Sequence, residues 1–86
     1  MTELYVGNLL YEVTIEEVRA LVKPFGAIYT LDLFTEPTPE RPHAYAFIQM
    51  DRREDAEAAI KALDGGQFMG RTLRVELAEA ERAEVW

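Results

Sequence analysis

The amino-acid sequence predicts an α+β sandwich in which a four-stranded antiparallel sheet carries two helices on one face. Two observations predict it. In stretches 4–9 and 43–50, ring-bearing or polar side chains alternate with small or aliphatic ones, which is the period of a strand with one buried face. In stretches 14–25 and 54–63, apolar residues instead recur at helical spacing. The 86 residues therefore read as one domain with the order β-α-β-β-α-β.

The first half of the chain supplies a strand, a helix and a second strand. A short strand is expected over Leu4–Gly7, and a helix is expected to begin at Thr14, which has the spacing of a capping box with Glu17. The helix presents one apolar stripe, formed by Ile15, Val18, Leu21, Val22 and Phe25. The second strand is expected over 28–35, and three prolines within 36–42 indicate a loop after it.

The second half repeats this pattern. After the strand at 43–50, Asp51 and Glu54 have the spacing of a second capping box. The helix that follows has a face of mostly small residues, formed by Ala56, Ala59, Ile60 and Leu63. Gly65–Gly66 ends this helix, and 72–77 alternates as the last strand. The order is that of the ferredoxin-like split βαβ fold, whose sheet keeps one face open.

Stretches Leu4–Leu9 and His43–Met50 resemble the paired motifs of the RNA recognition motif family, and the first matches throughout. The similarity extends from residue 2 to about residue 78. It implies that the two middle strands carry the motifs side by side, with base-stacking and sugar-contacting rings at Tyr5, Tyr45 and Phe47. The alternation agrees, because turning these rings toward the helices would expose the aliphatic and alanine side chains between them. Rings that pack in the core are the alternative.

The second motif departs from the family's pattern at three positions. Ala44 stands where the family has glycine and Met50 where it has an aromatic residue, and both are expected to face the core. His43 stands where the family has a lysine or arginine that contacts phosphate. A histidine can make that contact only when protonated, and a loop-end histidine without a task is the alternative.

The charge of the chain is unusual for a nucleic-acid binder, because 16 acidic residues against 9 basic ones give a net charge of -7. With a bulge expected in the second strand, Asp32 and Phe34 are placed on the open face, together with Glu3, Glu76 and the cation Arg74. We therefore expect weak binding. Four arginines in loops or at element ends are further candidates for phosphate contacts, with solvated side chains as the alternative: Arg41, Arg52, Arg53 and Arg71.

These observations predict binding of single-stranded RNA, with single-stranded DNA as an alternative ligand. Tyr5 and Tyr45 are expected to stack on successive bases, and Phe47 to contact a sugar or base. Polar contacts are expected from Asn8, His43, Gln49 and Arg74. We expect no cofactor and no metal site.

Two other classes of function were weighed. Relatives that bind peptides carry an Arg-Xaa-Phe motif before the last strand, and Gly66–Phe68 keeps the phenylalanine but lacks the arginine. A protein partner or a homodimer is therefore the alternative function. An enzyme is not expected, because one histidine and no cysteine leave little from which to build a catalytic centre.

The remaining predictions concern the ends of the chain and its surroundings. Residues 1–78 are expected to form the domain and 79–86 an acidic tail, either a short helix or a frayed end. No stretch approaches the roughly 20 apolar residues that cross a bilayer, and the first residues lack the basic and apolar blocks of a signal peptide. We expect a soluble cytoplasmic protein that resembles the short single-domain members of the family in bacteria.

Overall fold

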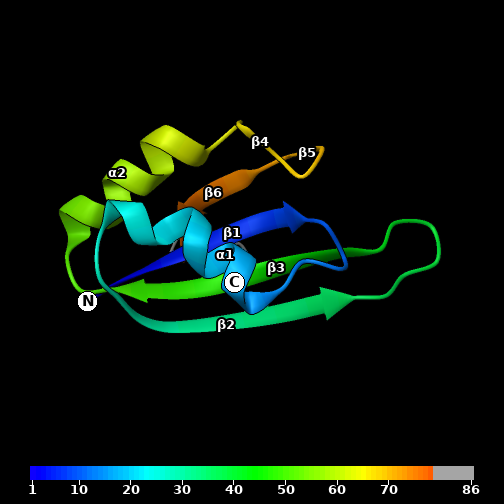
Figure 1. The fold of residues 1–86 in the computed structure, drawn as a ribbon, viewed down its shortest axis with the longest axis horizontal. Helices are drawn as coiled ribbons and strands as arrows, with labels where there is room; N and C mark the ends of the chain where they lie inside the picture. The colour runs from blue at the N-terminus through cyan, green and yellow to red at the C-terminus, as the bar shows by residue number, and fades with distance from the viewer. Residues whose placement is uncertain (79–86) are drawn as a thin grey trace, which may run out of the picture.

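The computed structural model describes residues 1–78 and contains a four-stranded antiparallel sheet with two helices packed on one face (Figure 1). The elements are β1 Thr2–Leu9, α1 Ile15–Val22, the 3-10 turn η1 Lys23–Phe25, β2 Ile28–Glu36, β3 His43–Met50, α2 Arg53–Leu63, β4 Gln67–Phe68, β5 Arg71–Thr72 and β6 Arg74–Leu77. The predicted order of the main elements is confirmed, with a small hairpin added before the last strand. The predicted tail at 79–86 lies outside the described residues.

The sheet has the strand order β2-β3-β1-β6, so that the two strands bearing the family motifs lie side by side in its middle, as predicted. Tyr5 of β1 pairs with Phe47 of β3, and Val6 pairs with Ala46. Paired residues of neighbouring strands lie on the same face. The rings of both motifs therefore share one face, and the small and aliphatic residues share the other.

The hydrophobic core lies between the sheet and the helices. The alternate residues of the inner strands are fully buried there, including the two that depart from the family's pattern: Leu4, Val6, Ala44, Ala46, Ile48 and Met50. Helix α1 adds Val18 and Val22, and α2 adds Ala56 and Ala59, all without exposed surface. Alanine at the contact lets α2 lie close to the sheet. The predicted assignment of faces on β1 and β3 is thus confirmed.

Helix α1 begins as predicted, at a complete capping box. The backbone N–H of Glu17 donates to Oγ1 of Thr14 at 3.2 Å, and the backbone N–H of Thr14 donates to Oε1 of Glu17 at 2.8 Å. The predicted apolar stripe is wrong at its first position, because Ile15 is 39% exposed. Ile15 is the first residue of the helix, and the buried residues of α1 are Val18 and Val22.

Helix α2 begins one residue later than the second capping pattern predicts. Its N-cap is Arg52, whose side chain has only donors and makes no capping hydrogen bond. The backbone N–H of Asp51 is bound to the carbonyl of Ala27, just before β2. The expected capping role of Asp51 and Glu54 is therefore wrong. Instead, Arg52 donates to Glu54 at 2.5 Å, and this hydrogen bond lowers the pKa of the Glu54 carboxyl below its ordinary value.

A two-stranded hairpin, β4–β5, divides the strand that was predicted over 72–77. Met69 and Gly70 form its two-residue turn with φ angles of 52° and 82°, the pair of positive values of a type I′ turn. Two backbone hydrogen bonds between 65–66 and Leu73 attach the hairpin to β6, and Asp64 accepts from the N–H of Val75 at 2.9 Å. The last strand of the main sheet is consequently only four residues long.

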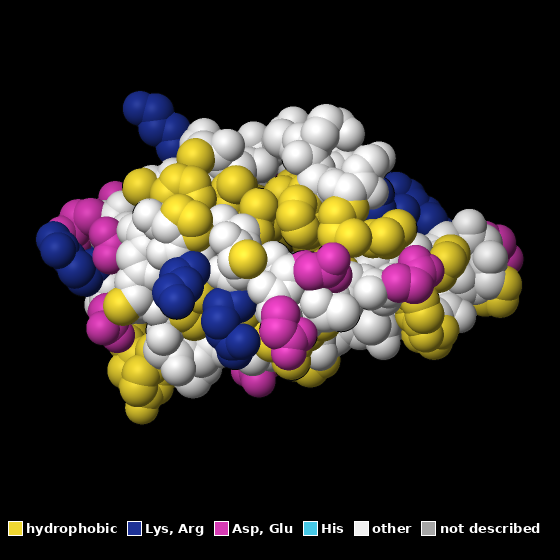
Figure 2. Space-filling model, in the orientation of Figure 1, with side chains coloured by type: hydrophobic (Ala, Val, Ile, Leu, Met, Phe, Trp, Pro, Cys, Tyr) yellow, Lys and Arg dark blue, Asp and Glu magenta, His cyan; other side chains and the backbone are white. Residues whose placement is uncertain are grey.

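The face that carries the helices shows a band of hydrophobic side chains between α2 and α1 (Figure 2). Partly buried residues such as Leu21, Ile60 and Leu63 pack there against the core. Neither helix within 1–78 combines the length and the apolar character needed to cross a membrane.

Candidate nucleic-acid interface

Four aromatic rings lie in contact on the sheet face that the helices leave uncovered. The centroid of Tyr5 is 6.1 Å from that of Tyr45 and 5.5 Å from that of Phe47. Phe34 of β2 stacks on Tyr45 at 5.4 Å with an angle of 22° between the ring planes. We name these four residues the aromatic platform. Phe34 was placed on this face from the sequence but was not counted among the site residues, and its register opposite Tyr45 brings it into the cluster.

The platform is accessible to a ligand, although its rings also support one another. Phe34 is 44% exposed, and the other three rings are half-buried by their neighbours. Tyr45 and Phe47 meet edge to face at 89°, one of the arrangements that aromatic pairs prefer. Contiguous apolar surface of this kind on a small domain usually marks an interaction site.

Gly7 gives the Tyr5 ring its position. Both residues face the platform side of β1, and the ring extends along the strand over Gly7. A Cβ atom at Gly7 would lie 2.6 Å from Cε2 and 2.7 Å from Cζ of Tyr5, closer than a carbon can approach. The absence of a side chain at Gly7 therefore allows the ring to lie low against the sheet.

Asn8, for which a ligand contact stays a prediction, also holds the β4–β5 hairpin. It adopts a φ of 63° at an irregularity in β1, a conformation that asparagine tolerates better than most residues. Its Nδ2 donates to the carbonyl of Thr72 at 2.6 Å, and its Oδ1 accepts from Nη2 of Arg71 at 2.6 Å. Arg71 also donates through Nε to the Asn8 carbonyl at 3.0 Å. Asn8 and Arg71 thus join the end of β1 to the hairpin.

His43 and Gln49 lie at opposite ends of β3, with Tyr45 and Phe47 between them. Gln49 lies opposite Glu3 and accepts a hydrogen bond from Oγ1 of Thr30 at 3.1 Å. The structure therefore brings the three predicted rings together. Of the predicted polar residues, Asn8, His43 and Arg74 line one hollow beside the rings, whereas Gln49 lies near the other end of β3.

The surroundings of the platform are acidic, as predicted. Four carboxylates lie on strand positions of this face: Glu3, Asp32, Glu36 and Glu76. Arg74, opposite Gly7, shares the face and forms an ion pair with Glu76, in which Nε lies 3.2 Å from Oε2. Asp32 lies opposite Phe47, after an irregularity of β2 between Ile28 and Thr30. The prediction that Asp32 lies on the open face is therefore confirmed.

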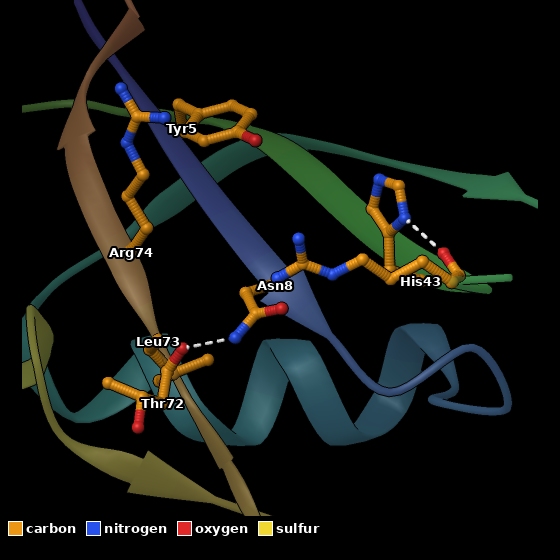
Figure 3. A pocket seen from close by; sticks show the side chains of 7 residues that line it. Tyr5, Asn8, His43, Thr72, Leu73 and Arg74 are labelled. Atoms are coloured by element: carbon orange, nitrogen blue, oxygen red, sulfur yellow. Dashed lines mark hydrogen bonds between the residues drawn. The ribbon is translucent and has the colours of Figure 1, made fainter.

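A hollow of about 490 Å³ adjoins the platform at the end where His43 lies (Figure 3). Its lining residues are Tyr5, Asn8, Arg41, His43, Thr72, Leu73 and Arg74. Nδ1 of His43 is 2.9 Å from the carbonyl of Arg41, and a carbonyl can only accept, so this nitrogen carries the hydrogen. Within 1–78, no three histidine, aspartate or glutamate side chains gather closely enough to hold a metal ion.

The fold and the face together define a class of protein. An antiparallel β-α-β-β-α-β domain with helices on one face and half-buried rings on the other face of its middle strands is a ferredoxin-like domain with an aromatic open sheet face. The chain belongs to the RNA recognition motif family, whose sequence model matches residues 4–74.

Relatives from cyanobacteria share much of the sequence. The chain is 38% identical over 76 residues to "Putative RNA-binding protein RbpA" of Nostoc sp., a match that covers 88% of this chain and 74% of that protein. It is 36% identical over 86 residues to "Putative RNA-binding protein RbpD" of the same organism, covering 96% of this chain and 92% of that protein.

Solved structures share the fold. The crystal structure of RNA binding protein PG1 matches with a TM-score of 0.78 and 32% identity over 90% of this chain and 93% of that one. One chain of an Sxl-lethal protein/RNA complex matches with a TM-score of 0.77 and 31% identity over 88% of this chain and 47% of that one.

Proposed function

We propose that this protein binds single-stranded RNA across the open face of its sheet, with the aromatic platform as the surface on which bases stack. The observation that carries the proposal is the contact cluster of four rings on the uncovered face. The names of the two cyanobacterial relatives, which refer to RNA binding, and the fold shared with the Sxl-lethal protein/RNA complex support it.

Stacking supplies most of the affinity in this proposal. Each base stacked on an aromatic side chain contributes roughly 1 to 3 kcal/mol. Tyr5 and Tyr45 take successive bases, and Phe47 lies against a sugar or a base. Phe34, which stacks on Tyr45, either extends the platform by one position or holds the Tyr45 ring flat.

Binding is weak in this proposal because the surroundings of the platform repel phosphates. The face carries four carboxylates, and Arg74 is partly neutralised by Glu76. For single strands, the logarithm of the binding constant falls with the logarithm of the salt concentration. The slope is about 0.7 for each phosphate that the protein neutralises. We therefore propose a dissociation constant on the order of micromolar and a shallow salt dependence, because stacking depends little on salt.

A backbone-amide NMR titration tests the proposal directly. The protein is titrated at low salt with short random single-stranded RNA, and the titration is repeated with the Tyr45→Ala, Phe47→Ala double variant. Shifts centred on the platform that disappear in the double variant are the expected result. A parallel titration with DNA of the same lengths distinguishes the two nucleic acids.

A matched control separates stacking from general damage to the sheet. Tyr29→Ala removes a ring that is 62% exposed and lies where β2 is irregular, away from the platform. It should leave RNA binding intact. A platform that shows no shifts with RNA at millimolar concentration would contradict the proposal and direct attention to a protein partner or a homodimer.

A further inference from the structure

The hollow beside the platform has a lining whose charge is opposite to that of the whole protein. The chain has 16 acidic and 9 basic residues, yet the seven lining residues include two arginines, the only histidine and no carboxylate. The two arginines and His43 reach the hollow from different elements, since Arg41 lies in the loop between β2 and β3, His43 begins β3 and Arg74 begins β6. The tertiary fold therefore gathers positive charge at one end of an acidic face.

The lining also presents hydrogen-bond donors. Because Nδ1 of His43 donates to the carbonyl of Arg41, its second ring nitrogen points away from that carbonyl (Figure 3) and becomes a donor when the ring is protonated. Asn8 uses one of its two Nδ2 hydrogens on the Thr72 carbonyl.

We propose that this hollow is a phosphate-binding subsite that takes a phosphoryl group of the nucleotide whose base lies on Tyr5. This inference rests on the proposed function, because Tyr5 belongs both to the platform and to the lining of the hollow. A phosphoryl group is an anion that only accepts hydrogen bonds, and such bonds from cationic donors are the strong ones. The lining offers arginine side chains and further donors, and it includes no carboxylate.

Arg41 is the main source of charge in this subsite. Arg74 is shared with Glu76 through two contacts, at 3.2 Å and 3.3 Å, and Glu36 lies opposite His43 on β2. Arg41 thus replaces, from the neighbouring loop, the cation that is missing at position 43. Its backbone is fixed, since its N–H donates to the carbonyl of Thr38 at 3.3 Å and its own carbonyl accepts from His43.

Four small ligands test which phosphate group of the RNA occupies the hollow. These are the uridine dinucleotide UpU, UpU with a 5′-phosphate, UpU with a 3′-phosphate, and inorganic phosphate. The readouts are the imidazole signals of His43, which are unique because the chain has one histidine, and the backbone amides of Thr72 and Arg74. Equal shifts with all three dinucleotides would assign the hollow to the internal diester. Shifts about tenfold stronger with one terminal phosphate would assign it to that end.

The variant that tests the charge is Arg41→Ala, which keeps both backbone contacts of this residue. It should weaken binding of the preferred dinucleotide about tenfold and reduce the salt slope by about 0.7. Arg41→Lys should retain more of the affinity than Arg41→Ala. Arg19→Ala is the matched control, because it removes the same charge from an exposed position of α1, on the helix side of the molecule, and should change the affinity less than twofold.

The outcomes separate this inference from the proposed function. Shifts on the platform with no shift at the hollow, and equal affinities for Arg41→Ala and Arg19→Ala, would overturn the subsite and leave RNA binding standing. Shifts at the hollow alone, including with inorganic phosphate, would support the subsite and contradict stacking on the platform. The absence of shifts at the platform and at the hollow with every probe would overturn both the subsite and the proposed RNA binding.

Discussion

Replacing Gly7 with alanine should abolish stacking on Tyr5 without unfolding the protein. The added Cβ would meet the Tyr5 ring at 2.6 to 2.7 Å, so the ring must leave its position over β1. Gly7 itself does not have a positive φ, and an alanine backbone is therefore allowed there. The clash involves the far end of a side chain that can rotate away, and the stability should change by no more than about 1 kcal/mol.

The loss of affinity follows from the stacking that is removed. One base stack is worth roughly 1 to 3 kcal/mol, which corresponds to a loss of about 5-fold to 150-fold in affinity. Fluorescence anisotropy with a labelled single-stranded RNA measures this loss, and urea unfolding of the same sample measures stability. Tyr5→Ala should show a loss of similar size.

A double-mutant cycle makes the reasoning refutable. If Gly7→Ala acts only by displacing the Tyr5 ring, then adding it to Tyr5→Ala should have little further effect, and the two changes will be strongly non-additive. A folded Gly7→Ala protein that binds RNA as tightly as the wild type would refute the argument. Additive losses would show that Gly7 acts through something other than the ring.

Three further predictions concern other parts of the molecule. Asn8→Ala removes the partner of Arg71 and should lower the free energy of unfolding by about 1 to 3 kcal/mol in urea titrations, with loss of protection in the amides of the hairpin. His43→Arg restores a permanent cation and should raise RNA affinity several-fold and steepen the salt slope by about 0.7, while Arg19→Lys should change neither. Arg52→Ala should raise the lowered pKa of Glu54 toward its ordinary value, because it removes the hydrogen bond and the charge of Arg52, and NMR titration of the carboxyl measures this change. In the wild type, the small stabilisation from the Arg52–Glu54 pair is fully present at pH values above the ordinary pKa of glutamate. It is lost as the pH falls through the lowered pKa of Glu54.

The faces of the sheet could be predicted from the sequence because side-chain alternation is a local property of strands. The position of Phe34 on the open face followed once a bulge was allowed early in β2, and the structure confirms both. Its contact with Tyr45 depends on the register between two strands, which alternation alone does not specify. The sequence therefore predicted that Phe34 lies on the open face of the sheet, but not that its ring contacts the other rings of the platform.

The hairpin β4–β5 was missed because its turn lacks the usual signal. Two-residue turns of this type favour asparagine or aspartate before glycine, and here Met69 takes the first position with a φ of 52°. The role of Asn8 depends on this hairpin, because its amide binds Thr72 and Arg71 across more than sixty residues of sequence. The sequence therefore does not predict this structural role of Asn8, and its contact with a ligand stays a prediction.

The start of α2 was misplaced for a similar reason. Asp51 has the residue type and spacing of an N-cap, but its backbone N–H is bound to the carbonyl of Ala27, just before β2. That long-range bond keeps Asp51 outside the helix, and Arg52 takes the N-cap position without a side-chain bond. A capping pattern is read from neighbouring residues, so it does not reveal a competing hydrogen bond to a residue distant in sequence.

The central position of the motif strands has a consequence for motion. β1 and β3 are each hydrogen-bonded to a strand on both sides, whereas β2 and β6 have an outer edge. Amides in such inner strands exchange with solvent slowly, because they open only when much of the domain opens. Three of the four rings therefore stand on the slowest-exchanging part of the molecule rather than on a loop. A ligand that stacks on them meets a surface already ordered, so little conformational entropy is lost in forming the complex.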